Sequence, residues 1–393
     1  VDTEVPSLSN VQLVSNNTDN SSLAKAGEVI TLSFSSSESI DRPSVTLGGE
    51  TKLAFGSGTS WTTTYEVKPG DDGIISSPLE LEGLVLWLDA ENVDGEKNNS
   101  LNLNSEIEKW TDLSGNGNHA LPNSFGGKPS LISEDGKNFI SFEESNKESL
   151  ALANASQLDF GKDQDFSYVV IYKTDTVSSS YETALLSKRD GSNGYQLYLR
   201  SSNGGAPSDD AITFIGSEDE NSKYFATSTE SNHKDDLLHI VSSTFDKDGA
   251  NVIYLDGNKK SEVLINEIGN SSSIFPLEIG HEFYTGQTSK YFYEGEIAEI
   301  IIYDRVLDQS ELAKLSYYLS KKWERTNFVN SDDDGMYDFE DPSPAGPINE
   351  PKRATFEIEF ADIAGNRGGP VSQTNGSKVG IDTTDPKLLD VSI

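Results

Sequence analysis

Oxygen-bearing side chains recur at a regular spacing in NSDDDGMYDFED, which runs from Asn330 to Asp341. Counted from Asn330, carboxylate or amide oxygens fall at positions 1, 3, 5, 9 and 12, and Gly335 occupies position 6. Calcium loops use this spacing because the glycine permits a sharp turn, position 7 offers its backbone carbonyl and the side chains converge on the cation. The stretch therefore predicts a Ca2+ site, with a solvated acidic linker as the alternative. The predicted ligands are Asn330, Asp332, Asp334, Met336, Asp338 and Asp341.

A second polar stretch, WTDLSGNGNHA, runs from Trp110 to Ala120. Its two glycines open backbone conformations that other residues rarely adopt, which predicts a tight turn. Aspartate and asparagine side chains in such a turn either bond their own backbone or offer oxygens to a cation or a ligand. We predict that Asp112 binds metal and that Asn116, Asn118 and His119 contact a ligand. A purely structural turn is the alternative.

Three further loops carry the groups that sugar recognition needs. DAENVDGE contains Asp89, Asn92 and Asp94, and the others are KRDGSNGY and the stretch 283–293 with Tyr284. Carboxylates and amides bond sugar hydroxyls, and an aromatic ring covers the apolar side of the sugar. We predict Asp89, Asn92, Asp94 and Tyr284 as ligand-binding residues, although Asn- and Asp-rich turns are often only turns.

Catalytic chemistry is less well supported. Glu294, Glu296 and Glu299 lie in EGEIAEIIIYD, and two carboxylates flank the scissile bond in glycoside hydrolases. Residues three apart on a strand point to opposite faces, so Glu296 cannot pair with Glu299, whereas Glu294 and Glu296 share a face. The absence of cysteine excludes disulfides and thiol catalysis, and the four histidines show no metal-ligand spacing. We therefore expect a protein that is not an enzyme and keep a hydrolase as an alternative.

Composition limits the partners. The chain has 393 residues, 30 basic and 65 acidic side chains, and a net charge of −35. Such a charge disfavours nucleic acid and anionic membranes, and bound cations would relieve the self-repulsion. No apolar run approaches the ~18 residues that span a membrane.

Alternation of apolar and polar residues predicts mostly β-strands. Both ends of the chain show this period of two, at residues 29–36 and 60–67 and again at 356–360. Neither end has enough strands to close a sandwich by itself. Further strands are expected at 167–172, 237–245, 251–255 and 295–307, and a helix that Asp308 and Glu311 cap follows at the end of this central region.

These patterns resemble two families. GLVLWLDA with SGNGNHA, and GEIAEIIIYDRVL followed by a helix, resemble the laminin-G-like, concanavalin A-like jelly rolls of bacterial surface proteins. LAKAGEVITLSFSSSE, GSGTSWTTTYEV and FEIEFADIAGN resemble the tandem Ig-like repeats of large bacterial adhesins, and NSDDDGMYDFED resembles thrombospondin type 3 repeats. The resemblance to adhesin repeats implies calcium at module junctions, with Asp362 and Asp382 as ligands.

We therefore predict an all-β protein in which a concanavalin A-like jelly-roll sandwich is inserted into a split Ig-like β-sandwich. The expected parts are residues 1–75 and 351–393 for the Ig-like sandwich, 78–326 for the lectin domain and 327–350 for the calcium-loop linker. The expected role is calcium-dependent binding of cell-surface or extracellular glycans by a monomeric segment of a secreted, RTX-type bacterial adhesin, next to neighbouring adhesin modules. A structural or protein-binding spacer and a glycoside hydrolase are the alternatives.

Overall fold

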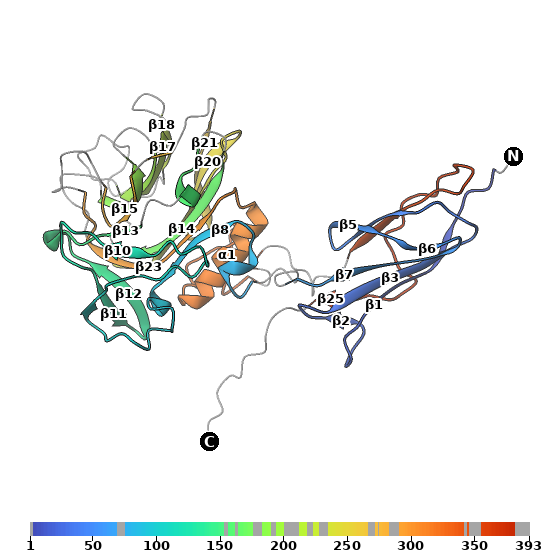
Figure 1. The fold of residues 1–393 in the computed structure, drawn as a ribbon, viewed down its shortest axis with the longest axis horizontal. Coiled ribbons are helices and arrows are strands. Elements are labelled where there is room, and N and C mark those ends of the chain that lie inside the picture. Colours follow the sequence, from blue (N-terminus) through green and yellow to red (C-terminus); the bar gives the residue numbers. More distant parts are fainter. Residues whose placement is uncertain are drawn as a thin grey trace, which may run out of the picture. The chain divides into compact units, whose positions relative to one another are not determined.

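A computed structural model describes residues 3–68, 75–152, 156–161, 164–175, 183–189, 194–199, 212–217, 223–227, 235–265, 272–273, 275–282, 291–341, 344–345 and 355–381. The chain divides into two compact units. Unit 1 contains the described parts of residues 1–76 and 347–393, and unit 2 those of residues 77–346. Most regular elements are strands (Figure 1), so the predicted all-β class is confirmed.

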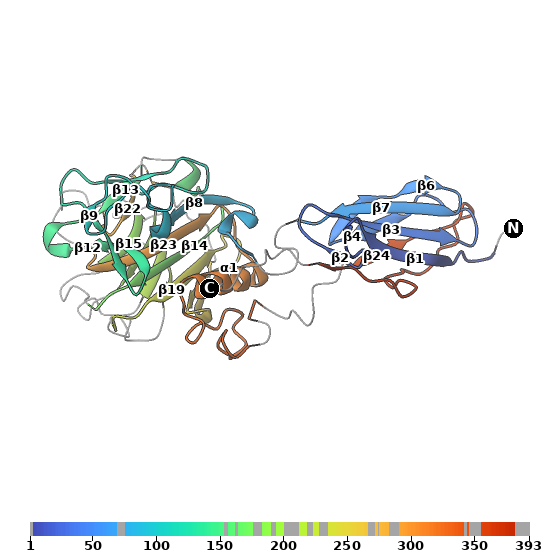
Figure 2. The same ribbon diagram turned by 90° about the horizontal axis from the view of Figure 1, so that it is seen from below.

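Unit 1 is built from strands of both chain ends. Its four-stranded sheet has the order β1-β3-β7-β6, in which β1, β3 and β7 run side by side (Figure 2). A three-stranded sheet has the order β24-β4-β5, and β2 pairs in parallel with β25. The strands are β1 (Leu8–Ser15), β2 (Leu23–Ala24), β3 (Val29–Ser36), β4 (Ser44–Leu47), β5 (Glu50–Leu53), β6 (Phe55–Ser57), β7 (Ser60–Glu66), β24 (Phe356–Glu359) and β25 (Gly380–Ile381).

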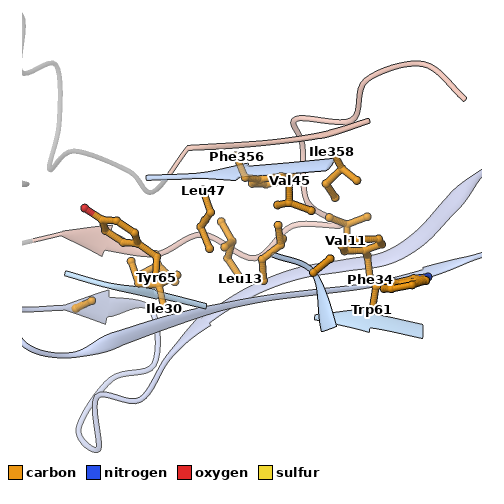
Figure 3. Packing of buried hydrophobic residues seen from close by; sticks show 14 of the residues in the cluster. Val11, Leu13, Ile30, Phe34, Val45, Leu47, Trp61, Tyr65, Phe356 and Ile358 are labelled. Carbon is orange, nitrogen blue, oxygen red and sulfur yellow. The ribbon is translucent and has the colours of Figure 1, made fainter. Parts of the chain in front are cut away.

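The core of unit 1 explains why both ends are needed. Alternate residues of β3 and β7 are buried, as the period of two predicts. Phe356 and Ile358 pack in the same apolar cluster as Val45 and Leu47 (Figure 3). Strand β24 also pairs with β4, from Phe356 opposite Leu47 to Glu359 opposite Ser44. The late segment therefore completes a core that the early one leaves open. The assignment of unit 1 to the Ig-like family stays a prediction.

Unit 2 is a sandwich of two large sheets. The seven-stranded sheet has the order β10-β13-β22-β15-β16-β17-β18. Its strands are β10 (Ala120–Pro122), β13 (Leu150–Leu152), β15 (Thr183–Arg189), β16 (Gly194–Leu199), β17 (Ile212–Ser217), β18 (Lys223–Thr227) and β22 (Leu277–Ile279).

The nine-stranded sheet has the order β21-β20-β19-β14-β23-β12-β11-β9, and β8 also pairs with β23. Its strands are β8 (Leu84–Asp89), β9 (Ser105–Glu106), β11 (Ser130–Glu134), β12 (Lys137–Phe142), β14 (Phe166–Lys173), β19 (His239–Phe245), β20 (Ala250–Leu255), β21 (Asn258–Leu264) and β23 (Gly295–Tyr303). The unit also has short 3-10 helices at Pro78–Glu80, Ala90–Asn92, Glu144–Asn146 and Ser156–Leu158.

Aromatic side chains fill the space between the two sheets. The rings of Phe166 on β14 and Tyr195 on β16 lie 4.9 Å apart, and Phe160 stacks on Phe166 at 4.3 Å. The central strand β14 is buried from Phe166 to Tyr172, since sheet neighbours and the second sheet both cover it. This packing fixes which face of each sheet points inward.

Helix α1 (Gln309–Lys322) follows β23, as the sequence predicts. The Asp308 side chain accepts a hydrogen bond from the Glu311 backbone, and the Glu311 side chain accepts one from the Asp308 backbone, which completes the predicted capping box. Leu312, Leu315 and Leu319 are buried. No helix in the described part of the chain has the length and apolarity that crossing a membrane requires.

Candidate functional site

Polar side chains line the face of the seven-stranded sheet that points away from the other sheet. Tyr195 points into the aromatic layer between the sheets, so Gln196, the next residue on β16, points outward. Gln196 lies opposite Ser187 of β15, and Ser187 lies opposite Glu278 of β22. Residues that face each other across strands lie on the same side of a sheet. These three polar residues therefore form one row on the outward face.

The row continues into a connected group that we name the polar face: Ser187, Arg189, Gln196, Glu278, His281 and Glu282. The Gln196 amide donates to Glu282 Oε2 at 3.0 Å. Arg189 Nη1 lies 3.4 Å from Gln196 Oε1 and 3.7 Å from Glu282 Oε1. All six side chains belong to residues that are 0–8% exposed. Polar groups gathered in such a dry place make strong hydrogen bonds, and leaving them unpaired is costly.

Ser187 and His281 contribute unpaired polar atoms to this group. Within the part of the chain that the structure describes, Ser187 Oγ and both ring nitrogens of His281 are buried without a hydrogen-bond partner. Buried polar atoms in folded proteins are nearly always paired, so these atoms make the polar face a candidate ligand site. The Glu278 carboxylate, 3.8 Å from His281 Nδ1, accepts a hydrogen bond from the Asn123 amide at 2.5 Å.

Aromatic rings border the polar face beside His281. The Phe292 ring stacks on the imidazole with centroids 4.3 Å apart, and the Phe125 ring lies 5.2 Å from it. Phe125 and Asn123 are partly exposed, whereas Phe292 is buried. The edge at Asn123 and Phe125 thus combines an amide, an aromatic ring and a way to solvent, the groups that a sugar-binding site requires.

In the stretch WTDLSGNGNHA, the side chain of Asp112 makes hydrogen bonds within the protein. Asp112 Oδ1 accepts hydrogen bonds from the backbone of Trp87 and Ser114, and Oδ2 accepts them from the backbone of Asn118 and from Ser114 Oγ, all at 2.9–3.0 Å. A carboxylate offers about four acceptor positions, so these bonds use them all. Asp112 therefore ties the turn to β8 and keeps no lone pair for a cation.

The neighbours of Asp112 hold the same turn. Asn116 and Asn118 donate their side-chain amides to the backbone carbonyls of Leu84 and Val85, and His119 Nδ1 accepts the Asp112 backbone N–H at 3.0 Å. The structure gives the whole stretch a role in packing against β8. Ligand contact by Asn116, Asn118 and His119 stays a prediction.

Hydrogen bonds within the loop after β8 also order much of that loop. Asp94 accepts hydrogen bonds from Glu96, Asn98 and Ser100. Burial raises the pKa of Asp94 and these bonds lower it, with a net fall to about 2. Asn92 accepts the backbone N–H of Lys97, and Asp89 caps the following 3-10 helix. Asn92 and Asp94 thus order their own loop, and Asp89 also pairs with Lys322 of α1. Tyr284 lies outside the described residues.

The acidic loop brings three of its predicted ligands together. Oxygens of Asp332, Asp334 and Asp341 lie within 4.8 Å of one another. Burial and the neighbouring charges of Asp334 and Asp341 raise the pKa of Asp332 to about 6. A divalent cation bound by the three carboxylates would offset this repulsion. The loop also exposes Met336, whose backbone N–H bonds Asp334 Oδ1.

Two other predicted ligands of this loop point elsewhere. Asp338 is buried and accepts hydrogen bonds from Ser331 and Ser320, so it anchors the loop to α1. Asn330 is buried against the β20–β21 turn, where its amide donates to Asn258 Oδ1. Asp362 in unit 1 accepts two hydrogen bonds from Asn366, and Asp382 lies outside the described residues.

Comparison with known proteins supports the architecture of unit 2. Residues 144–313 match the model of the concanavalin A-like lectin/glucanases superfamily. The chain carries a domain of this superfamily. The jelly-roll fold that the sequence predicts for this region is therefore confirmed. No curated protein matches the chain.

Several solved structures are similar to part of this chain. The binding domain of Paraclostridial Mosquitocidal Protein 1 is 15% identical with a TM-score of 0.45, and the match covers 61% of this chain and 52% of that one. The botulinum neurotoxin serotype G binding domain is 15% identical with a TM-score of 0.43, and the match covers 60% of this chain and 51% of that one. Domain 4 of the arabinanase AbnA from Geobacillus stearothermophilus, in complex with arabinotriose, is 13% identical with a TM-score of 0.43, and the match covers 60% of this chain and 97% of that domain. The match spans about half the length of the first two of these chains.

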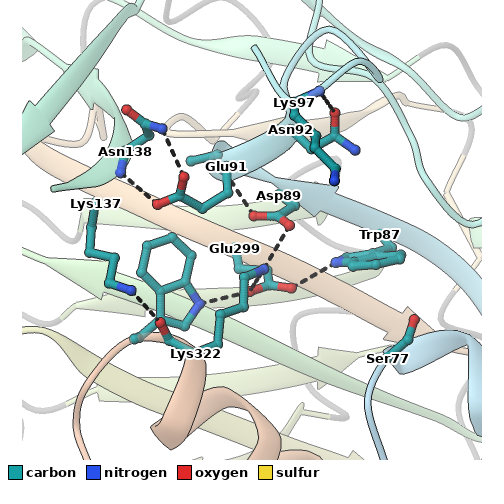
Figure 4. Close-up of polar contacts among 12 residues, drawn as sticks. Ser77, Trp87, Asp89, Glu91, Asn92, Lys97, Lys137, Asn138, Glu299 and Lys322 are labelled. Atoms are coloured by element: carbon teal, nitrogen blue, oxygen red, sulfur yellow. Dashed lines mark hydrogen bonds and ion pairs between the residues drawn. The ribbon is translucent and has the colours of Figure 1, made fainter. Parts of the chain in front are cut away.

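The superfamily also includes glucanases, so the carboxylates of β23 need separate attention. Glu299 of the jelly roll is fully buried, and its oxygens accept hydrogen bonds from the indoles of Trp87 and Trp323 at 2.7 Å (Figure 4). Lys322 Nζ bridges Glu299 and Asp89 at 2.8 and 2.6 Å. Glu294 accepts a backbone hydrogen bond from Glu144. Glu299 is therefore a structural group that fixes α1 to the sheet and cannot reach a sugar.

The polar face escaped the sequence analysis because its members are far apart in the chain. Gln196 and Glu278 are single polar residues in otherwise apolar strands, and Ser187 begins the polar end of β15. The signal that could have identified Gln196 and Glu278 is the alternation in GYQLYL and LEIGHE. Only strand pairing shows that the three positions form one row.

Proposed function

We propose that the protein is the glycan-binding segment of a secreted bacterial surface adhesin and that it holds the glycan at the polar face of its jelly-roll domain. The match to the lectin/glucanases superfamily supports the lectin class. The observation that carries the proposal is the set of buried, unpaired atoms of Ser187 and His281 beside Glu278. Sugar hydroxyls both donate and accept, so one glycan end can pair them all.

A single site of this kind binds weakly, with a dissociation constant of about 0.1–1 mM, or roughly −4 to −5.5 kcal/mol. Several copies of an adhesin on one cell would compensate through avidity. Because the side chains are buried, the glycan end enters beside the partly exposed Asn123 and Phe125. A spacer that binds protein is the competing function, and the test below separates the two.

The test uses two hydroxyls of one strand. Ser187→Ala removes an unpaired hydroxyl from the polar face, and Thr183→Val removes an unpaired hydroxyl from the opposite face of β15, which pairs with Leu199 on the inner side. Glycan-array hits of the wild-type chain are titrated with both variants. Ser187→Ala should weaken binding about 5- to 10-fold, the loss of one hydrogen bond, while Thr183→Val binds normally. Absence of any glycan hit, or equal binding by both variants, would contradict the proposed site.

We also propose that Asp332, Asp334 and Asp341 bind one Ca2+ and that this ion orders the acidic loop. Their convergence and the raised pKa of Asp332 support this proposal. Asp334→Ala should reduce the calcium stoichiometry in calorimetry by one, whereas Asp333→Ala, next to it and outside the cluster, should leave it unchanged. The affinity of the wild type should fall below pH 6 because Asp332 then takes up a proton, by about tenfold per pH unit. An unchanged calcium stoichiometry in Asp334→Ala would contradict the calcium site and mean that the loop is an acidic linker.

A further inference from the structure

The charges of the polar face are unbalanced. Among the described residues that contact it, Arg189 supplies the positive charge, and its guanidinium lies beside Glu282 and Gln196. Lys188 points to the other side of the sheet, where Nζ donates to the backbone carbonyls of Ser273 and Phe275. Arg189 therefore offsets Glu282, and within the described part of the chain no lysine or arginine pairs with the second carboxylate, Glu278.

Glu278 is buried, at 2% exposure, and an amide and an imidazole lie beside its carboxylate. Asn123 Nδ2 donates to Oε2 at 2.5 Å, and His281 Nδ1 lies 3.8 Å from the same oxygen. A carboxylate accepts about four hydrogen bonds, so Glu278 has capacity left for donors of a ligand. A buried charge needs such donors more than an exposed one does, because water does not solvate it.

Among the described residues of the polar face, a ligand bound here meets two carboxylates, Glu278 and Glu282, and one guanidinium, Arg189. A ligand carboxylate or sulfate beside Glu278 would be repelled and would lose its own hydration. A hydroxyl donates one hydrogen bond to Glu278, and a protonated amine donates up to three while balancing the charge. The same geometry thus favours donors and disfavours anions.

On the basis of the proposed glycan site, we infer that the polar face selects neutral sugars and, more strongly, sugars with a free amine, and that Glu278 excludes sialylated, uronic and sulfated glycan ends. Glu278 acts as the specificity-determining residue. Ser187, Gln196 and His281 bond hydroxyls that all these sugars share.

The test compares three trisaccharides of similar size on the full chain at 0.15 M salt: glucosamine trimer, its fully N-acetylated form and trigalacturonic acid. The glucosamine trimer should bind most tightly, the N-acetylated trimer next, and the acidic trimer at least tenfold more weakly than the neutral one. Salt at this concentration screens charges that lie more than about 8 Å from the ligand, including most of the −35 net charge of the chain. The difference in affinity between the trisaccharides therefore reports on the charges of the site itself.

Two variants of equal net charge locate the effect. Glu278→Gln keeps the shape and can still accept from Asn123, whereas Glu108→Gln removes a carboxylate whose side chain is 76% exposed. The amine-over-acid preference should fall at least tenfold in Glu278→Gln and persist in Glu108→Gln. Thermal unfolding shows whether both variants fold. If Glu278→Gln does not fold, the comparison of the three trisaccharides on the wild-type chain still tests the charge selection.

The outcomes separate the two proposals. Binding of the acidic trimer as tight as that of the neutral one would overturn the charge selection and leave glycan binding intact. An equal loss of preference in both variants would also overturn it, because the effect would then come from net charge. If none of the three trisaccharides binds, and the glycan array is also empty, glycan binding itself fails together with this inference.

Discussion

Replacing Lys322 by Met should test the buried cluster of Trp87, Asp89, Glu299 and Trp323. The variant keeps the length and the apolar stem of the side chain and removes the ammonium, which makes two short contacts to carboxylates. Removing one partner of a buried ion pair costs about 3–5 kcal/mol, because the remaining charge is left buried. Glu299 retains both indole donors, so we expect a loss near 3 kcal/mol in the free energy of unfolding at pH 7.

The loss should depend on pH in a defined direction. Burial raises the pKa of Glu299 to about 6, although Lys322 opposes the rise. A carboxyl whose pKa is higher in the folded chain than in the unfolded one stabilises the fold when it is protonated. For Glu299 this contribution is complete at pH values below its unfolded pKa, near 4.5, and it is lost as the pH rises through 6. In the wild type this corresponds to about 2 kcal/mol. Without Lys322 the pKa rises further, so at pH 5 Glu299 is neutral and the variant should lose only about 1–2 kcal/mol, through Asp89.

Urea unfolding at pH 7 and pH 5, followed by tryptophan fluorescence, measures both values. Trp87, Trp110 and Trp323 report on unit 2, and Trp61 reports on unit 1. Lys321→Met is the matched control, because this neighbouring lysine is exposed. The reasoning is refuted if the two variants lose equal stability at pH 7, or if the loss in Lys322→Met is the same at both pH values.

Three further predictions follow from the contacts described. Asp112→Ala should lower the free energy of unfolding by about 2–4 kcal/mol, because three backbone N–H groups lose their acceptor, and should leave calcium stoichiometry unchanged; a loss of bound calcium in calorimetry would restore Asp112 as a metal ligand. His281→Phe keeps the stacking with Phe292 and removes the unpaired nitrogens, so thermal stability should hold while glycan affinity falls about 5- to 10-fold; unchanged affinity would exclude His281 from the site. Residues 1–72 alone should not unfold cooperatively, whereas the same segment joined to residues 354–393 should, since Phe356 and Ile358 complete the core; a cooperative transition of the short fragment in circular dichroism would contradict this.

The sequence predicted those elements whose signals are local. The run SYVVIY lies in β14, and Asp308 and Glu311 form the capping box of α1, because β-branched residues and cap side chains act within a few positions of the chain. The burial of Leu312, Leu315 and Leu319 likewise follows from helical periodicity.

The candidate site depended on information that the sequence does not carry locally. Asp112 and Asn116 have the composition of a ligand loop, and only the position of β8 shows that backbone groups of Trp87 and Leu84 already pair with them. Asp338 fits the calcium spacing by its number, yet Ser320 of α1 binds it from another element. Strand register, which joins Ser187 to Glu278, is decided by the whole sheet.

The construction of unit 1 from both chain ends has a mechanical consequence. Tension applied at residues 3 and 381 enters and leaves through unit 1, since both belong to it. The pairs of β4 with β24 and of β2 with β25 join the two segments, so these hydrogen bonds carry the force. As long as they hold, the sandwich with the polar face stays outside the stretched path. A pulling force on such a chain must therefore separate β4 (residues 44–47) from β24 (residues 356–359) before it stretches the jelly roll.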